Sequence, residues 1–103
     1  MARYLRDSRI LVWDSDIDST LKALNDKIKY RLQQKGYKGF TSDLEIIGCI
    51  KLELDEYVEA VQQRKPKADK LEELLDIAWA ALLAHVTISV VRDEEPFENA
   101  TTD

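Results

Sequence analysis

The feature that most constrains the fold of this 103-residue chain is a long apolar run near its C-terminus. Residues 74–91 are almost all apolar, and the run is interrupted by Asp76 near its start and His85 in its middle. Both polar side chains are costly inside a bilayer, and the run is barely long enough to span one. We therefore expect a helix buried among other helices, not a membrane span. A charge at Asp76 must then be paired, neutralised or bound to a metal.

Composition narrows the class of protein further. The length suits one domain with one compact core. Fifteen Lys and Arg against twenty Asp and Glu give a net charge of -5, the wrong sign for a protein that binds nucleic acid by neutralising phosphates. Cys49 is the only cysteine, and the N-terminus lacks the pattern of a secretory signal. We expect a cytoplasmic protein without a disulfide.

Two stretches with helical periodicity precede the apolar run. In the first, apolar residues recur every three or four positions, which predicts a helix over residues 16–35, with Asp18 as an alternative start. In the second, Ser42 followed by Glu45 forms a capping box. Helical spacing of apolar residues then continues to about Gln63.

A third helix is expected after Pro66, which disfavours helix at the residue before it. Asp69 with Glu72 forms a second capping box and predicts that the helix starts there. Its apolar residues occupy nearly every angle of the helical wheel after Asp76, which indicates the most buried element of the fold. The β-branched segment 86–91 either frays or extends this helix.

These elements predict an all-α fold, a small bundle of three main helices. The helical domain is expected over residues 16–92, with an N-terminal arm over 1–15 and a disordered tail over 93–103. Three amphipathic helices with broad apolar faces form only a shallow bundle. We therefore expect self-association into a homodimer or homotetramer.

Two pairs of acidic residues lie on the second and third predicted helices. Glu53 and Glu56 are three residues apart and so share one helix face, and Glu73 and Asp76 repeat that spacing. Because a short turn joins the helices, they should pack antiparallel, so that both pairs can face each other. Four such carboxylates repel unless a divalent cation neutralises them, and oxygen ligands favour Mg²⁺ or Mn²⁺ over zinc. The alternative is a solvated acidic face on a non-enzymatic interaction or regulatory module.

The stretch LELDEYVEAV, followed after a short basic turn by KLEELLDIAWAAL, resembles the MazG-type all-α nucleoside triphosphate pyrophosphohydrolases. That family's signature is E-x-x-E, a spacer and E-x-x-D, and the resemblance covers roughly residues 17–90. It implies hydrolysis of a nucleoside triphosphate to the monophosphate and pyrophosphate, by a dimer or tetramer. It also implies that the Mg²⁺ ligands are Glu53, Glu56, Glu73 and Asp76. The chain departs from the family where Leu52 replaces a frequent second acid and Asp55 replaces a frequent small residue.

Further candidates would complete such a site. Glu59 or Glu72 is a candidate for orienting or deprotonating the attacking water, and the sequence does not choose between them. Substrate-binding candidates are Lys51 for a phosphate, Trp79 for stacking on a base, and Asn25 for a base edge or ribose. The simpler interpretations are a solubilising charge, a core side chain and a helix-surface amide.

His85 is not part of the predicted site. It has no second histidine at metal-binding spacing and no cysteine partner. We interpret it as a core or interface histidine.

Overall fold

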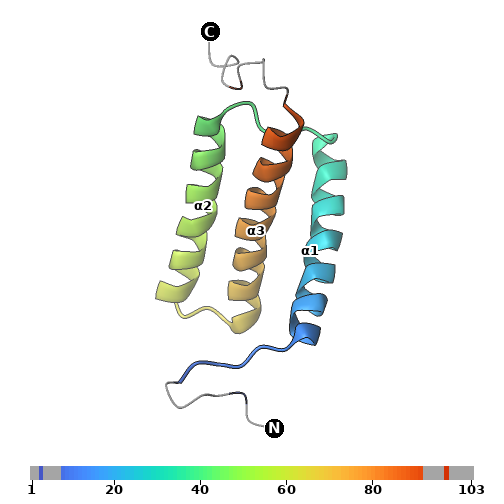
Figure 1. The fold of residues 1–103 in the computed structure, drawn as a ribbon. Coiled ribbons are helices and arrows are strands. Elements are labelled where there is room, and N and C mark those ends of the chain that lie inside the picture. Colours follow the sequence, from blue (N-terminus) through green and yellow to red (C-terminus); the bar gives the residue numbers. More distant parts are fainter. Residues whose placement is uncertain (1–2, 4–7, 92–96, 98–103) are drawn as a thin grey trace.

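Three helices make up the fold in the computed structural model, which describes residues 3, 8–91 and 97. Helix α1 spans Asp14–Lys35, α2 spans Asp43–Gln62 and α3 spans Lys67–Val90. Figure 1 shows α3 between the other two, with α2 antiparallel to α3 and α1 parallel to it. No β-strand occurs within the described ranges. The predicted all-α class is confirmed.

Helix α1 starts earlier than predicted and ends where predicted. Its N-cap is Trp13, whose backbone N–H donates to a carboxylate oxygen of Asp16 at 2.8 Å. Asp16 therefore stabilises the first turn from inside the helix, and neither Asp16 nor Asp18 is the cap. At the other end Gly36 adopts a left-handed conformation with φ 69°, which terminates the helix after Lys35.

The segments that flank the helical domain are only partly described. Residues 14 and 15 belong to α1, so the N-terminal arm is shorter than the predicted 1–15. Within the arm, Arg3 forms an ion pair with Asp16 at 2.6 Å and lies over the Trp13 ring at 5.4 Å from its centroid. The predicted tail, 93–103, lies outside the described residues except for Phe97.

The start of α2 is largely as predicted. The Ser42 hydroxyl accepts a hydrogen bond from the backbone N–H of Glu45 at 3.1 Å, as an N-cap serine should. The Glu45 carboxylate, however, accepts from the backbone N–H of Thr41 at 2.7 Å. The reciprocal hydrogen bond of the capping box is therefore made to the backbone of Thr41, one residue before Ser42.

The predicted start of α3 is wrong. The helix begins at Lys67 with Pro66 as its N-cap, and no side chain caps its first turn by a hydrogen bond. The backbone N–H of Asp69 donates to the Pro66 carbonyl at 3.0 Å, so Asp69 lies within the first turn. The β-branched segment 86–91 extends the helix as far as Val90.

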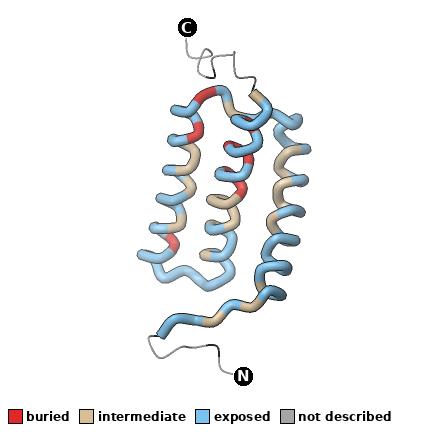
Figure 2. Tube along the Cα trace, in the orientation of Figure 1, coloured by how far each residue is buried: buried red, intermediate tan, exposed pale blue. Residues whose placement is uncertain are grey.

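The core lies between α2 and α3, and α1 packs only loosely against α3. Figure 2 shows the buried positions on the facing sides of α2 and α3, whereas α1 has no buried residue. Helix α3 contributes most of them, as predicted. His85 is exposed, so it is not a core histidine. The buried side chains of the two helices are those of Ile46, Ala60, Trp79, Ala80, Leu83, Ala84 and Thr87.

Two features of α3 reflect its apolar composition. By length and composition alone it is long and apolar enough to cross a membrane, the one such helix among the described residues. Only 28% of its most apolar 18-residue window is buried inside the fold. Large apolar side chains also remain exposed on it, among them Leu71, Leu74, Val86 and Ile88.

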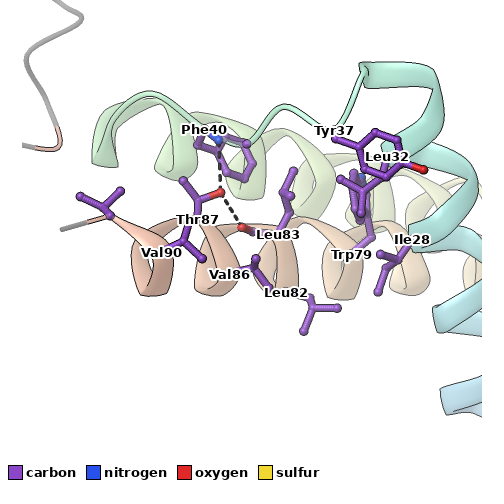
Figure 3. Close-up of a pocket in the computed structure, with 12 residues that line it drawn as sticks. Ile28, Leu32, Tyr37, Phe40, Trp79, Leu82, Leu83, Val86, Thr87 and Val90 are labelled. Carbon is purple, nitrogen blue, oxygen red and sulfur yellow. Dashed lines mark hydrogen bonds between the residues drawn. The ribbon is translucent and has the colours of Figure 1, made fainter.

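A close contact fixes the α1–α2 loop to the second half of α3. The Thr87 hydroxyl donates to the Leu83 carbonyl at 2.7 Å and accepts from the backbone N–H of Phe40 at 3.3 Å (Figure 3). Gly39 lies directly against Thr87. A Cβ atom at position 39 would lie 3.2 Å from Thr87 Cγ2 and closer still to its Oγ1. The absence of a side chain at Gly39 therefore permits this contact.

We predict that Gly39→Ala lowers the free energy of unfolding by about 1–3 kcal/mol, because the added methyl group overpacks the contact with Thr87. Gly48→Ala is the matched control, since a Cβ atom there meets nothing within 4 Å. Alanine in the interior of α2 should instead stabilise by about 0.5–1 kcal/mol. Urea denaturation followed by circular dichroism measures both. Equal stabilisation by the two substitutions would contradict this account of Gly39.

Candidate metal centre

Helices α2 and α3 bring the four predicted acids into one electrostatic cluster, hereafter the acidic cluster (Glu53, Glu56, Glu73 and Asp76). Because the helices are antiparallel, the middle of α2 lies opposite the first half of α3 (Figure 1). The charges of Glu56 and Asp76 each raise the pKa values of both Glu53 and Glu73. The four acids therefore lie near enough to one another across the α2–α3 interface for their charges to interact.

Glu53 is the acid whose surroundings are least favourable to a charge. Its side chain is half-buried, and its Oε2 atom is shielded from solvent and has no hydrogen-bond partner. Burial raises the pKa of Glu53, and the charges of Glu56, Asp76 and Glu73 raise it further. Arg31 opposes this shift only weakly. Glu53 thus carries a buried oxygen that a proton or a cation would stabilise.

Glu73 and Glu56 lie closer to solvent. Glu73 is half-buried and Glu56 is exposed. Burial is the largest cause of the raised pKa of Glu73, followed by the charges of Glu56 and Asp76, and Lys65 and Lys27 oppose it. The cluster therefore runs from a buried end at Glu53 to an open end at Glu56, where a ligand has access.

Asp76 is held by two cations from α1. The Lys27 ammonium lies 2.6 Å from Asp76 Oδ1, and Arg31 Nη2 lies 3.4 Å from the same oxygen. Lys27 also forms an ion pair with Glu72. Burial by itself lowers the pKa of Lys27, but the hydrogen bonds to Asp76 and Glu72 outweigh it and raise that pKa. The charge of Asp76 within the apolar run is therefore paired with two cations, as a charge withdrawn from water needs to be.

Sequence reasoning missed Lys27 and Arg31. A signal was present, since the two cations are one helical turn apart. They also flank the apolar stripe of α1 at Ile28 and Leu32. The partner on α3, however, is 45 or more residues away in the sequence, and no local pattern identifies it.

The acidic cluster suits a hard divalent cation in its chemistry. Carboxylate oxygens are the donors that Mg²⁺ and Mn²⁺ prefer, and Glu53 Oε2 is a buried oxygen without a partner. As the side chains stand, no group of three or more His, Cys, Asp or Glu residues in the described part of the chain is placed to hold a metal ion. Coordination therefore requires the carboxylates to turn toward a common centre. At Asp76 it also requires competition with Lys27.

The two candidates for handling the attacking water lie in different settings. Glu59 is exposed and accepts a hydrogen bond from Gln63 Nε2 at 2.9 Å. Glu72 is also exposed, but it shares Lys27 with Asp76 and so lies beside the acidic cluster. Within the described residues, Lys27 thus connects Glu72 to the cluster through its ion pairs with Glu72 and Asp76, and no such link joins Glu59 to it.

The candidates for substrate binding are dispersed. Asn25 and Lys51 are exposed, and no hydrogen bond or ion pair within the described ranges joins either to the acidic cluster. Trp79 is only 6% exposed, so the simpler interpretation as a core side chain holds. It also lines a mainly apolar cavity of about 320 Å³ between α1, the α1–α2 loop and α3 (Figure 3), together with Ile28, Phe40 and Leu83.

A scan of protein-family models, a search of curated proteins and a search of solved structures each found no match to this chain. The resemblance of its two acidic tetrads to the MazG-type family therefore stays a prediction from the sequence.

We predict that the metal-free protein becomes more stable as the pH falls from neutral toward about 4.5, where the unfolded glutamates titrate. The pKa values of Glu53 and Glu73 are raised in the folded state, so between the unfolded and folded values the folded protein binds more protons. Stability must then decrease as the pH rises through that window. Thermal melting in the presence of a chelator over this pH range measures the slope.

Glu53→Gln should weaken this pH dependence and raise the stability at neutral pH by about 1 kcal/mol, because it removes the charge from a buried, unpartnered group. Glu59→Gln is the control, since Glu59 is exposed and hydrogen-bonded, and it should leave the slope unchanged. An unchanged slope in Glu53→Gln would show that the charge of Glu53 is not the origin of the effect.

Proposed function

We propose that this protein is a Mg²⁺-dependent nucleoside triphosphate pyrophosphohydrolase, which forms a nucleoside monophosphate and pyrophosphate. The observation that supports the proposal is a buried oxygen of Glu53 that lacks a partner, on a carboxylate whose pKa is raised by burial and by the charges of Glu56, Asp76 and Glu73. Electrostatic repulsion among these groups favours binding of a divalent cation. Mg²⁺, when bound, would neutralise phosphate charge and promote ionisation of water.

Cations next to the acidic cluster support a phosphate-containing substrate. Lys27 and Arg31 reach the cluster from α1, and Lys65 lies close enough to Glu73 to influence its pKa. Such groups can bind phosphate oxygens by charge-assisted hydrogen bonds. They replace Lys51, the candidate from the sequence, as the proposed phosphate ligands.

Glu72 is the proposed acceptor of the proton from the attacking water. Its position beside Lys27 and Asp76 supports this role over Glu59. One proton of the water passes to the carboxylate, and the water oxygen bonds to a phosphorus of the α–β anhydride. The bridging P–O bond then breaks, and the group beyond the bridging oxygen leaves with the bonding electron pair. That group is pyrophosphate if the α-phosphorus is attacked and the nucleoside monophosphate if the β-phosphorus is attacked.

The alternative is a helical interaction or regulatory module without catalytic activity. Two observations favour it: Asp76 already has cationic partners, and many large apolar side chains are exposed on α2 and α3. In that case the acids form a solvated face of the protein. A divalent cation should then have no more than a general salt effect on stability.

Mg²⁺ or Mn²⁺ should raise the melting temperature in a saturable manner through preferential binding to the folded state. Glu56→Gln should abolish that shift and reduce pyrophosphate release by about a hundredfold or more. Loss of a direct metal ligand should lower activity more than loss of a residue that only hydrogen-bonds to a ligand. Glu56 is exposed, so the helical content should not change. Asp55→Asn, one residue earlier, is the control and should retain both properties.

The substrates for this assay are a panel of canonical and modified nucleoside triphosphates. No saturable metal effect, together with no pyrophosphate from any member of the panel, would exclude the hydrolase and favour the interaction module.

We further propose that the protein is a homodimer or homotetramer. A groove of about 390 Å³ between the first halves of α1 and α3 is lined by Ala23, Leu71, Leu74 and Ala78, among others. Leu71 is 52% and Leu74 44% exposed. A chain of this size commonly covers such surface by self-association.

Light scattering coupled to size-exclusion chromatography should therefore give a multiple of the 11.9 kDa chain mass. Replacing both Leu71 and Leu74 with Gln should shift the mass toward that of the monomer while the helical content is retained, because both side chains are about half exposed. A monomer mass for the unmodified protein at all concentrations would refute self-association.

A further inference from the structure

We propose that the cavity between α1, the α1–α2 loop and α3 binds a small, flat, uncharged molecule that carries a hydrogen-bond acceptor. The cavity has a volume of about 320 Å³ (Figure 3). An apolar cavity of about 150 Å³ is large enough for benzene, so this one can hold fused rings. The proposed site is separate from the acidic cluster and needs no metal ion.

The wall of the cavity excludes a charged ligand. The described residues that line it include no Asp, Glu, Lys, Arg or His. The Thr87 hydroxyl already donates to the Leu83 carbonyl and accepts from the backbone N–H of Phe40. An ionised ligand would lose its hydration here without meeting an opposite charge, which is costly. The ligand that fits this wall is therefore uncharged.

Aromatic side chains in the wall favour a flat ligand. Tyr37 and Phe40 reach the cavity from the α1–α2 loop, and Trp79 reaches it from α3. Aromatic rings pack against one another in offset-stacked or edge-to-face arrangements, and each such pair adds to the effect of burial alone. A planar ring system can make these contacts with both sides of the cavity.

Trp79 supplies a hydrogen-bond donor for the ligand. Its side chain is 6% exposed, and its indole N–H has no acceptor within the described residues. In the described part of the chain, Glu53 Oε2 is the one fully shielded side-chain oxygen or nitrogen without a partner, so the indole nitrogen reaches open space. Trp79 lines the cavity, and Figure 3 shows its ring rising from α3 toward Tyr37 and Leu32. An acceptor on the ligand would satisfy this N–H.

Contacts near the two ends of the cavity hold it open. The hydrogen bond from the Phe40 N–H to Thr87 fixes the loop to α3 at one end. Near the other end, the ion pair of Lys27 with Asp76 links α1 to α3, and Ile28, the next residue of α1, lines the cavity. The cavity is therefore formed without a ligand, so binding does not have to order these elements.

Equilibrium dialysis with 2-acetylnaphthalene, whose ketone oxygen is an acceptor, tests the proposal. The unmodified protein should bind it saturably. Val86→Phe should weaken binding by about tenfold or more, because Val86 lines the cavity and the larger side chain fills it. Ile88→Phe is the matched control: the two residues lie on α3 and are 46% and 51% exposed, but Ile88 does not line the cavity. It should bind as the unmodified protein does.

Circular dichroism establishes that both variants keep their helical content. If Val86→Phe is unfolded, Val90→Phe replaces it, because Val90 also lines the cavity and is 72% exposed.

The indole N–H signals of the unmodified protein test the assigned donor by nuclear magnetic resonance. 2-Acetylnaphthalene should shift the Trp79 signal downfield, and 2-ethylnaphthalene, which has a similar shape and no acceptor, should not. Trp13, the N-cap of α1, does not line the cavity, so its signal is the internal control and should stay in place. Trp13→Phe assigns the two signals.

The outcomes are distinct. Saturable binding that Val86→Phe weakens and Ile88→Phe does not, with a downfield shift at Trp79 alone, supports the proposal. No saturable binding by the unmodified protein, or equal binding by both variants, overturns it. Equal shifts of the Trp79 signal by the two naphthalenes overturn the requirement for an acceptor. A cavity covered by a second copy of the chain predicts no binding and a lower assembly mass for Val86→Phe, which also overturns the proposal.

Discussion

The carboxylate of Asp76 lies in the most apolar helix of the fold, so its charge has to be neutralised. Two cations of α1, Lys27 and Arg31, neutralise it, and these ion pairs hold α1 beside α3. Helix α1 buries no residue of its own and packs only loosely on α3. Its polar links to α3 are the ion pairs of Lys27 and Arg31 with Asp76 and of Lys27 with Glu72. A buried ion pair adds little net stability compared with an apolar contact, but breaking it is costly. The pairs therefore place α1 beside the acidic cluster more than they stabilise the fold.

The acidic cluster is neutralised unevenly. Asp76, on the side of α1, has two cationic partners, whereas Glu53, on α2, has a buried oxygen with none. The pKa values of Glu53 and Glu73 rise because burial and neighbouring carboxylates both disfavour their charged forms. The local cations thus leave a net negative charge at the α2–α3 interface. Protonation of Glu53 or Glu73 at low pH offsets it, and the proposed divalent cation would offset it at neutral pH.

Features that depend on neighbours in the sequence were predicted well, and features that depend on tertiary contacts were not. The Ser42 cap and the end of α1 before Gly36 follow from local hydrogen bonds and backbone conformation. The start of α3 was predicted too late, at Asp69, because the N-cap of α3 is Pro66 and not Asp69. His85 is exposed, although its neighbours are apolar, because α3 has only two helices to cover its surface. The partners of Asp76 come from a helix whose sequence does not indicate where it packs.

The two ends of α1 are held by different kinds of contact, which bears on how the site can respond to a ligand. After its C-terminal end, Gly39 and Phe40 lie against Thr87, where close packing and a hydrogen bond leave no room for displacement. Its first half faces an open apolar groove at Leu71 and Leu74. Lys27 lies between these regions and forms ion pairs with Glu72 and Asp76. A ligand that moves α1 would therefore meet close packing at the loop end and an open groove at the other end.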